Sequence, residues 1–198
     1  MQFFKPNGYD TAEVLPENGG RARLPKGGYV CRILSVEEKE SKAGNPYLIL
    51  NLDICEGDYM GFFANDYQAQ TGEKKWHFSH RLMIPNDRTK PYTLHLFKTF
   101  NAYLEDSNPG WKFSFDADEK QYRGKVIGVL VNEREYETRD GRRKMATNIA
   151  KVVKANTVRN GSYTLPDDEM LKRPANASSN DDGFYVPDNV EDDDLPFN

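Results

Sequence analysis

The sequence predicts a mainly β domain in which one helix lies between the third and the fourth of five strands. Three observations predict this class. Within the segment 47–56 a Leu or Ile occupies every second position from 48 to 54, which is typical of a half-buried strand. A dense β-branched run begins at Val126 and is typical of a central strand. Pro91 opens a segment with apolar residues at helical spacing.

Turn residues bound the first three predicted strands. Segment 24–28 reads Leu-Pro-Lys-Gly-Gly and precedes a strand over about 29–38. Another turn at 41–46 leads into the second strand, 47–56. Its alternation places Leu48, Leu50, Leu52 and Ile54 on a core face and Tyr47 on the opposite face, which has the mixed composition of a binding face. The third strand is expected within about 74–84.

The helix and the last two strands complete the predicted order. Pro91 suits the first turn of a helix over about 91–104. Its apolar stripe consists of Leu96, Phe97, Phe100, Tyr103 and Leu104. The fourth strand, about 126–137, and the fifth, about 144–154, are joined by an Asp-Gly hairpin signal at 140–141. This order predicts an OB-fold, a five-stranded Greek-key barrel whose middle strands and loops commonly bind nucleic acid.

Composition divides the chain into four parts. Only 37% of the residues are hydrophobic and the mean hydropathy is -0.81, so part of the chain is expected to lie outside a core. We predict an irregular arm at 1–23, the OB domain at 24–160, a flexible linker at 161–190 and an acidic tip at 191–198. Phe3, Phe4 and Tyr9 of the arm could pack on the domain or on a second subunit.

The net charge of -4 is unevenly distributed. Residues 174–198 contain seven carboxylates and no Lys or Arg, which leaves +3 for the rest of the chain. A mildly basic domain with an acidic tail suits a nucleic-acid-binding protein. Cys31 and Cys55 lie within predicted strands and are expected to be buried thiols in a reducing compartment. Neither a long apolar run nor a signal peptide is evident, which predicts a soluble intracellular protein.

Binding of single strands requires cations for phosphates and aromatic rings on which bases stack. Two segments, 74–81 and 134–144, supply both cations and rings, and the outward-facing Tyr47 supplies one more ring. The predicted contact residues are Tyr47, Lys74, Lys75, Trp76, Arg81, Arg134, Tyr136, Arg139, Arg142, Arg143 and Lys144. His77 also lies in the second of these segments. Because Glu133, Glu135, Glu137 and Asp140 lie among the hairpin cations, an ordinary charged turn is the alternative there. Trp76 could equally belong to the core.

Catalysis and metal binding have weaker support. His77 and His80 form H-x-x-H, but on a strand their side chains would point to opposite faces. Asp53, Glu56 and Asp58 could form the metal cluster of a small nuclease, although acidic residues are common at strand ends. We predict no cofactor, no metal and no enzymatic activity. A metal-dependent nuclease and an adaptor whose barrel binds protein remain the alternatives.

The chain ends in Glu191-Asp192-Asp193-Asp194-Leu195-Pro196-Phe197-Asn198. Adjacent carboxylates beside an extended apolar pair make a good peptide ligand. From Asp192 to Phe197 the segment resembles the C-terminal tip of bacterial and phage single-stranded DNA-binding proteins. In that family the tip recruits replication and repair enzymes, which implies partner binding by Asp192, Asp193, Asp194, Leu195, Pro196 and Phe197. Family members usually end at the Phe, whereas Asn198 follows it here.

The domain is also similar to a family of small uncharacterised proteins of phage and prophage replication modules. The similarity is carried by Leu-Pro-Lys-Gly-Gly-Tyr at 24–29, Ser-Lys-Ala-Gly-Asn-Pro-Tyr at 41–47, Asp-Ile-Cys-Glu-Gly at 53–57 and Gly124-Lys125. Together the two resemblances imply a protein that coats single-stranded DNA during replication, recombination and repair. They also imply the cytoplasm of a bacterial host and a possible homo-oligomer.

Overall fold

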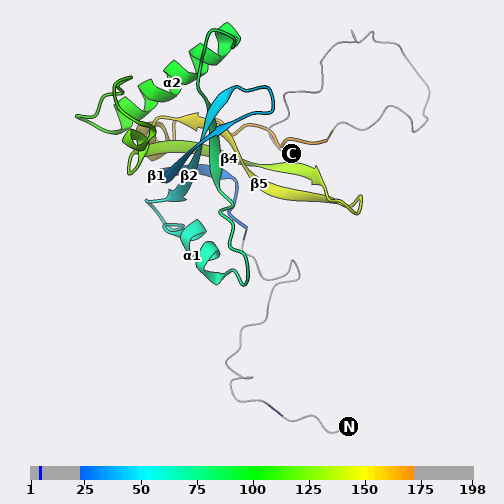
Figure 1. Cartoon of the computed structure of the whole chain (residues 1–198). Helices are drawn as coiled ribbons and strands as arrows, with labels where there is room; N and C mark the ends of the chain where they lie inside the picture. The colour runs from blue at the N-terminus through cyan, green and yellow to red at the C-terminus, as the bar shows by residue number, and fades with distance from the viewer. Residues whose placement is uncertain (1–4, 6–22, 172–198) are drawn as a thin grey trace, which may run out of the picture.

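The computed structural model describes Lys5 and residues 23–171. The elements of this part follow one another as β1 (Gly27–Glu40), β2 (Pro46–Ile54), α1 (Phe62–Ala69), β3 (Ser79–Met83), α2 (Pro91–Ser107), the 3-10 helix η1 (Glu119–Tyr122), β4 (Val126–Glu137), β5 (Arg143–Val153) and α3 (Ala155–Arg159) (Figure 1). The aromatic residues of the arm, residues 172–190 of the predicted linker and the acidic tip lie outside the described residues. Within those residues, no helix has the length and apolar character needed to cross a bilayer.

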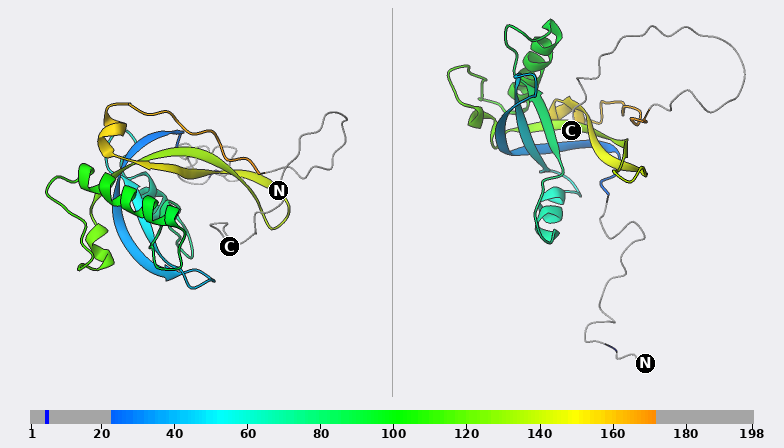
Figure 2. Two further views of the ribbon diagram at one scale, coloured as in Figure 1. Left: turned by 90° about the horizontal axis from the view of Figure 1, so that it is seen from above. Right: turned by 45° about the vertical axis from the view of Figure 1, so that its right-hand side comes forward.

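The five strands form one antiparallel sheet in the order β3-β2-β1-β4-β5. This confirms the mainly β class, the five strands and the position of the long helix α2 between β3 and β4. The prediction of a closed barrel is not confirmed, because the sheet is open and β3 and β5 are its two edges. Seen from above, the sheet curves and α2 lies across its concave side (Figure 2).

The core lies on the concave side, where the predicted alternation of β2 is confirmed. Leu48, Leu50, Leu52 and Ile54 are at most 2% exposed. β1 contributes Cys31 and Ile33 and then changes parity, because a bulge between Ile33 and Ser35 rotates the strand. After the bulge Val36 packs against the core. The bulge explains why the sequence of this strand shows no single alternation.

Helix α2 buries only part of its predicted stripe. Phe97, Phe100 and Leu104 are buried, whereas Tyr103 is half-buried and Leu96 is 51% exposed. Leu96 belongs to the apolar stripe in sequence, but the sheet does not cover it. Asn108 follows the helix, and its side chain donates to the carbonyl of Val126 and accepts from the Val126 N–H. The residue that ends the helix thus also ties it to the start of β4.

Residues after β5 pack on the convex side of the sheet. Gly128 lies so close to α3 that a Cβ there would meet the Lys154 carbonyl oxygen at 2.6 Å. The Gly28 N–H donates to the Tyr163 hydroxyl at 3.1 Å, and the Tyr163 ring covers that glycine. Glu169 then forms a parallel bridge with Arg134, on the edge of β4 that β1 leaves free. Residues 161–171 of the predicted linker therefore belong to the packed domain.

Candidate nucleic-acid interface

The structure separates the predicted contact residues into three groups. Tyr47 and Arg81 lie on the convex face of β2 and β3. Lys74, Lys75 and Trp76 lie in the connection between α1 and β3. The β4–β5 hairpin, which projects from the rest of the sheet (Figure 1), carries the remaining six residues, namely Arg134, Tyr136, Arg139, Arg142, Arg143 and Lys144.

The first group forms a stacked pair. Ile49 is opposite Arg81 in the ladder and Tyr47 is opposite Met83, so Tyr47 and Arg81 are diagonal neighbours on one face. The guanidinium carbon of Arg81 lies 3.8 Å from the centre of the Tyr47 ring. This is close for a cation–π contact. Arg81 Nε is enclosed and has no hydrogen-bond partner. The pair thus presents a cation and an aromatic ring together on the non-core side of the sheet.

A polar row crosses the same face beside this pair. Asn51 Nδ2 donates to Ser35 Oγ at 2.9 Å, and Ser79 Oγ donates to Asn51 Oδ1 at 2.6 Å. These side-chain hydrogen bonds connect β1, β2 and β3 in addition to the backbone hydrogen bonds of the sheet. Sequence reasoning missed it. The parity of β2 did place Asn51 on the outward face, but the bulge in β1 concealed the orientation of Ser35.

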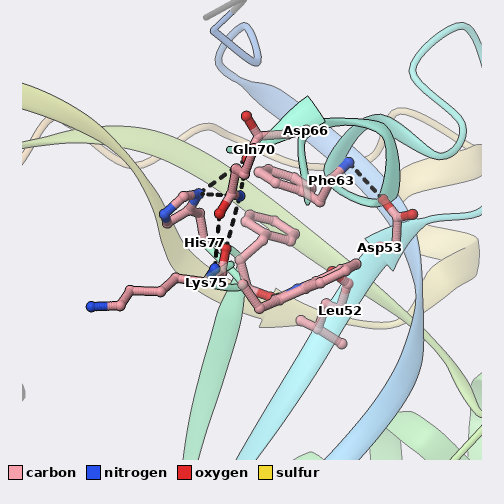
Figure 3. A network of polar contacts seen from close by, with 9 residues as sticks. Leu52, Asp53, Phe63, Asp66, Gln70, Lys75 and His77 are labelled. Carbon is pink, nitrogen blue, oxygen red and sulfur yellow. Dashed lines mark hydrogen bonds and ion pairs between the residues drawn. The ribbon is translucent and has the colours of Figure 1, made fainter. Parts of the chain in front are cut away.

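The connection between β2 and β3 is organised by α1, a helix that the sequence did not predict. Gly61 precedes it with φ of 77° and no side-chain cap. The carboxylate of Asp53, at the end of β2, accepts instead from the Phe63 N–H at 3.0 Å (Figure 3) and from the Ala64 N–H at 3.2 Å. Asp53 therefore caps α1, although it precedes Phe63 by 10 positions in the sequence.

A second set of polar contacts holds the segment that carries the predicted lysines. Gln70 accepts from the Lys75 N–H at 2.8 Å and donates to the Lys75 carbonyl at 2.9 Å (Figure 3). His77 Nδ1 lies 3.0 Å from an Asp66 carboxylate oxygen. The side chain of Lys74 reaches the Gln68 carbonyl, whereas that of Lys75 is 67% exposed and 3.7 Å from Glu73. Both lysines are exposed, and each already contacts a neighbouring group of this connection.

Trp76 is held against the core. Its indole N–H donates to the carbonyls of Leu52 at 3.0 Å and Phe78 at 2.9 Å, and the ring packs against the buried cluster. These contacts favour the core interpretation of Trp76 over the binding interpretation. The Trp76 ring is half-buried and its N–H already has two acceptors, so it anchors the segment between α1 and β3 to the sheet.

The hairpin forms at the predicted place. Thr138 N–H donates to the Arg142 carbonyl at 2.8 Å, and Gly141 has φ of 75°, a conformation that glycine adopts without strain. Arg142 Nε donates to Asp140 at 2.6 Å, and this hydrogen bond lowers the pKa of the Asp140 carboxyl group. Arg142 is therefore partly neutralised within its own turn.

Strand register sorts the hairpin charges by face. Tyr136 is opposite Lys144 and Arg134 is opposite Ala146, on the convex side. The other parity carries the acids, namely Glu133, Glu135 and Glu137. Arg143 joins the acidic face and lies 3.9 Å from Glu135. Arg134, Tyr136 and Lys144 thus form a basic and aromatic strip, whereas Arg143 belongs to the opposite side.

The C-terminal segment of the domain lies against this strip. Lys26 pairs with Asp168, which lowers the pKa of the Asp168 carboxyl group, and Arg134 Nε lies 3.7 Å from Glu169. Asn132 Nδ2 donates to the Asp167 carbonyl at 2.6 Å. Arg134 is therefore partly occupied by the chain itself, whereas Tyr136 is 41% exposed and Lys144 and Arg139 are exposed.

The acidic residues of the nuclease alternative have other partners. Asp53 caps α1, and Glu56 binds Arg159 through both oxygens at 3.0 and 2.6 Å. His77 contacts Asp66, and His80 stacks on Phe100 with ring centres 5.5 Å apart. Among the residues that the structure describes, no group of three or more His, Cys, Asp or Glu side chains is arranged to hold a metal ion.

Comparison with known proteins gives a match over part of the chain. A family model described as "Protein of unknown function (DUF669)" matches residues 7–77. The match runs from the N-terminal arm through β1, β2 and α1 and ends before β3. It includes Tyr47, Lys74, Lys75 and Trp76, but neither Arg81 nor the hairpin. A search of curated proteins finds no match.

Proposed function

We propose that this chain binds single-stranded DNA through the convex face of β1–β3 and the basic strip of the hairpin. The observation that carries the proposal is the Arg81 guanidinium 3.8 Å from the Tyr47 ring. Positive charge beside a flat ring is what sequence-tolerant binding of an unpaired strand requires. The Ser35–Asn51–Ser79 row adds hydrogen-bonding groups to the same face.

The strand order supports an OB-type architecture for this surface. In an OB-fold the first strand pairs with the second and the fourth, as β1 does here. Closure would require pairing of β3 with β5, which are the sheet edges. We infer an OB-like barrel that is open along this seam. Strands β2 and β3 carry Tyr47 and Arg81, and the β4–β5 hairpin carries Arg134, Tyr136 and Lys144.

The proposed function of the acidic tip is to bind partner proteins. Four carboxylates, Leu195 and Phe197 match the chemistry of a partner-binding peptide, and the resemblance to single-stranded DNA-binding proteins points to replication and recombination enzymes as partners. The chain would coat exposed strands in a bacterial cytoplasm and bring these enzymes to them without catalysing a reaction itself. Tethering raises the local concentration of the recruited enzyme on the coated strand.

The test is the fluorescence anisotropy of a labelled oligo-dT strand titrated with the full chain at low and rising salt. Arg81→Ala removes the cation from the stacked pair. We expect weaker binding by about 1–3 kcal/mol and a salt slope smaller by about one. Arg81→Lys keeps the charge but loses the planar stacking, so it should restore the slope more fully than the affinity.

Arg123→Ala is the matched control, because Arg123 is an exposed arginine at the end of η1, outside the proposed surface. If Arg81→Ala and Arg123→Ala lose equal affinity, the convex face is not the binding site. If the unaltered chain ignores oligo-dT even at low salt, single-strand binding is wrong and the adaptor alternative is favoured. Magnesium-dependent shortening of the labelled strand would favour the nuclease alternative.

A further inference from the structure

The side chain of Glu169 lies across one face of the β4–β5 hairpin. The backbone of this residue pairs with the edge of β4 that faces away from β5. Its N–H donates to the Glu133 carbonyl at 2.9 Å, and its carbonyl accepts from the Glu135 N–H at 2.7 Å. Its carboxylate nevertheless reaches Asn148 of β5, whose Nδ2 donates to Oε1 at 2.9 Å. The side chain of Glu169 therefore crosses β4 to reach its partner.

The face that Glu169 crosses is the one that carries the basic strip. Asn148 is opposite Asn132 in the ladder and Arg134 is opposite Ala146. Asn148 and Arg134 are therefore diagonal neighbours on this face. Glu169 Oε2 lies 3.7 Å from Arg134 Nε, while Oε1 accepts from Asn148. Each oxygen of the carboxylate thus has its own nitrogen partner.

The two faces of the hairpin differ in charge. The three glutamates of β4 project to the face opposite the strip, and Asp140 is held by Arg142 in the turn. The strand residues that project to the strip face are Asn132, Arg134 and Tyr136 of β4 and Lys144, Ala146 and Asn148 of β5. They include two cations and no carboxylate. Glu169 therefore adds a carboxylate to a face whose own strand residues carry none.

The carboxylate of Glu169 occupies a position that suits a phosphate of nucleic acid. Phosphate and carboxylate oxygens accept the same kinds of hydrogen bond from guanidinium and side-chain amide groups. Tyr136 lies two residues beyond Arg134 on the same face and is 41% exposed, so a base next to such a phosphate would have a ring beside it. The carboxylate oxygens of Glu169 thus stand in for phosphate oxygens.

We propose that Arg134 and Asn148 form a phosphate subsite that Glu169 fills when no strand is bound. The proposal rests on the proposed binding of single-stranded DNA, to which it adds a contact residue, Asn148, and an internal competitor. Displacement of Glu169 is inexpensive, because its side chain is 52% exposed and exposed ion pairs contribute little to stability. The adjoining Asp168 is paired with Lys26, so the competitor stays tethered beside the subsite.

The test is the oligo-dT anisotropy titration repeated with Glu169→Gln. This variant removes the charge but keeps the backbone hydrogen bonds of the segment, and its melting temperature checks the fold. We expect the affinity to rise by about three- to fivefold, the upper range for an exposed ion pair. The salt slope should steepen by up to about one, because one more phosphate contact forms. Glu169→Ala should have the same two effects.

Glu137→Gln is the matched control, because it removes the same charge from an exposed residue on the opposite face of the same hairpin. It should change the affinity by less than about twofold. Asn148→Ala examines the subsite directly. In the Glu169→Ala background it should lower the affinity by about threefold or more, because the donor contacts the strand there. In the unaltered chain, where Glu169 holds Asn148, the loss should be smaller.

The outcomes separate the subsite from the proposed function. If Glu169→Gln binds no more tightly than Glu137→Gln, the subsite is wrong, while binding through the convex face still stands. An equal loss from Asn148→Ala in both backgrounds would also overturn the subsite, because Asn148 and Glu169 would then act independently. Absence of oligo-dT binding by the unaltered chain and by both Glu169 variants at low salt would contradict the proposed function and the subsite together.

Discussion

Replacement of Asp53 distinguishes a structural carboxylate from a catalytic one. Asp53 is 6% exposed, and its oxygens accept from the N–H groups of Ile54, Phe63 and Ala64 at 2.9, 3.0 and 3.2 Å. The latter two are donors in the first turn of α1, where no helical carbonyl can reach them. In Asp53→Ala these donors lose a charged acceptor in a mostly buried setting.

The expected cost follows from those two hydrogen bonds. A hydrogen bond to a charged group contributes about 1.5–3 kcal/mol, and loss of a helix cap costs about 0.5–2 kcal/mol. Because the two contributions overlap, we expect Asp53→Ala to lower the free energy of unfolding by about 2–4 kcal/mol. Asp53→Asn keeps one oxygen but turns an amide group toward the second donor, so it should lose about 1–2 kcal/mol.

Urea denaturation followed by circular dichroism measures both changes. Asp58→Ala is the control, because Asp58 is exposed and its replacement should change stability by less than about 0.5 kcal/mol. A stability of Asp53→Ala equal to that of the Asp58 control would refute the capping role. It would also return Asp53 to consideration as a metal ligand of the nuclease alternative.

Three further predictions follow from the packing and the charges. Gly128→Ala should destabilise the domain by about 1–3 kcal/mol in the urea assay, because its Cβ would meet the Lys154 carbonyl oxygen at 2.6 Å. Gly27→Ala is the control, and it should be nearly neutral because its Cβ would have contacts of 3.5 Å. Burial lowers the pKa of His80 to about 4, so stability should fall by about 1.4 kcal/mol per unit as the pH drops from about 6.5 toward 4, since the unfolded chain takes up a proton that the folded one does not. His80→Phe should flatten the unfolding free energy in that window relative to the unaltered chain, and an unchanged pH profile would contradict the assignment. Removal of residues 175–198 should leave oligo-dT affinity equal or higher, because seven carboxylates are lost, and weaker binding in the anisotropy assay would show that the tail does not compete with DNA.

The parts of the fold that were predictable from the sequence are those with a local pattern. The alternation of β2 comes from its own residues, and the Asp140-Gly141 turn shapes its own hairpin. Helix α1 could not be found in this way. It has 8 residues, its capping position is Gly61, and its cap is supplied by Asp53 from the preceding strand. A contact between residues ten positions apart leaves no mark in a local pattern.

The candidate site shows the same division between local and long-range information. The outward parity of Tyr47 was predictable from β2 alone. Its contact with Arg81 depends on the register between β2 and β3, which only the folded sheet defines. The position of Trp76 likewise depended on the Leu52 and Phe78 carbonyls, which approach its indole once β2 and β3 have paired.

The packing of the segment after α3 changes how the domain and its tail should be separated. Composition placed the end of the domain near residue 160, because apolar residues become scarce there. Yet Tyr163 covers Gly28, and Glu169 pairs with the free edge of β4 between Glu133 and Glu135. A chain ending at 160 would therefore expose strand hydrogen-bonding groups and separate Lys26 from Asp168 and Arg134 from Glu169. If such a chain bound an oligonucleotide more tightly, the newly accessible cations would explain the gain, and loss of the tip would not be needed to explain it. Experiments on the acidic tail must consequently retain every residue through Leu171, or they will attribute to the tip an effect that belongs to the domain.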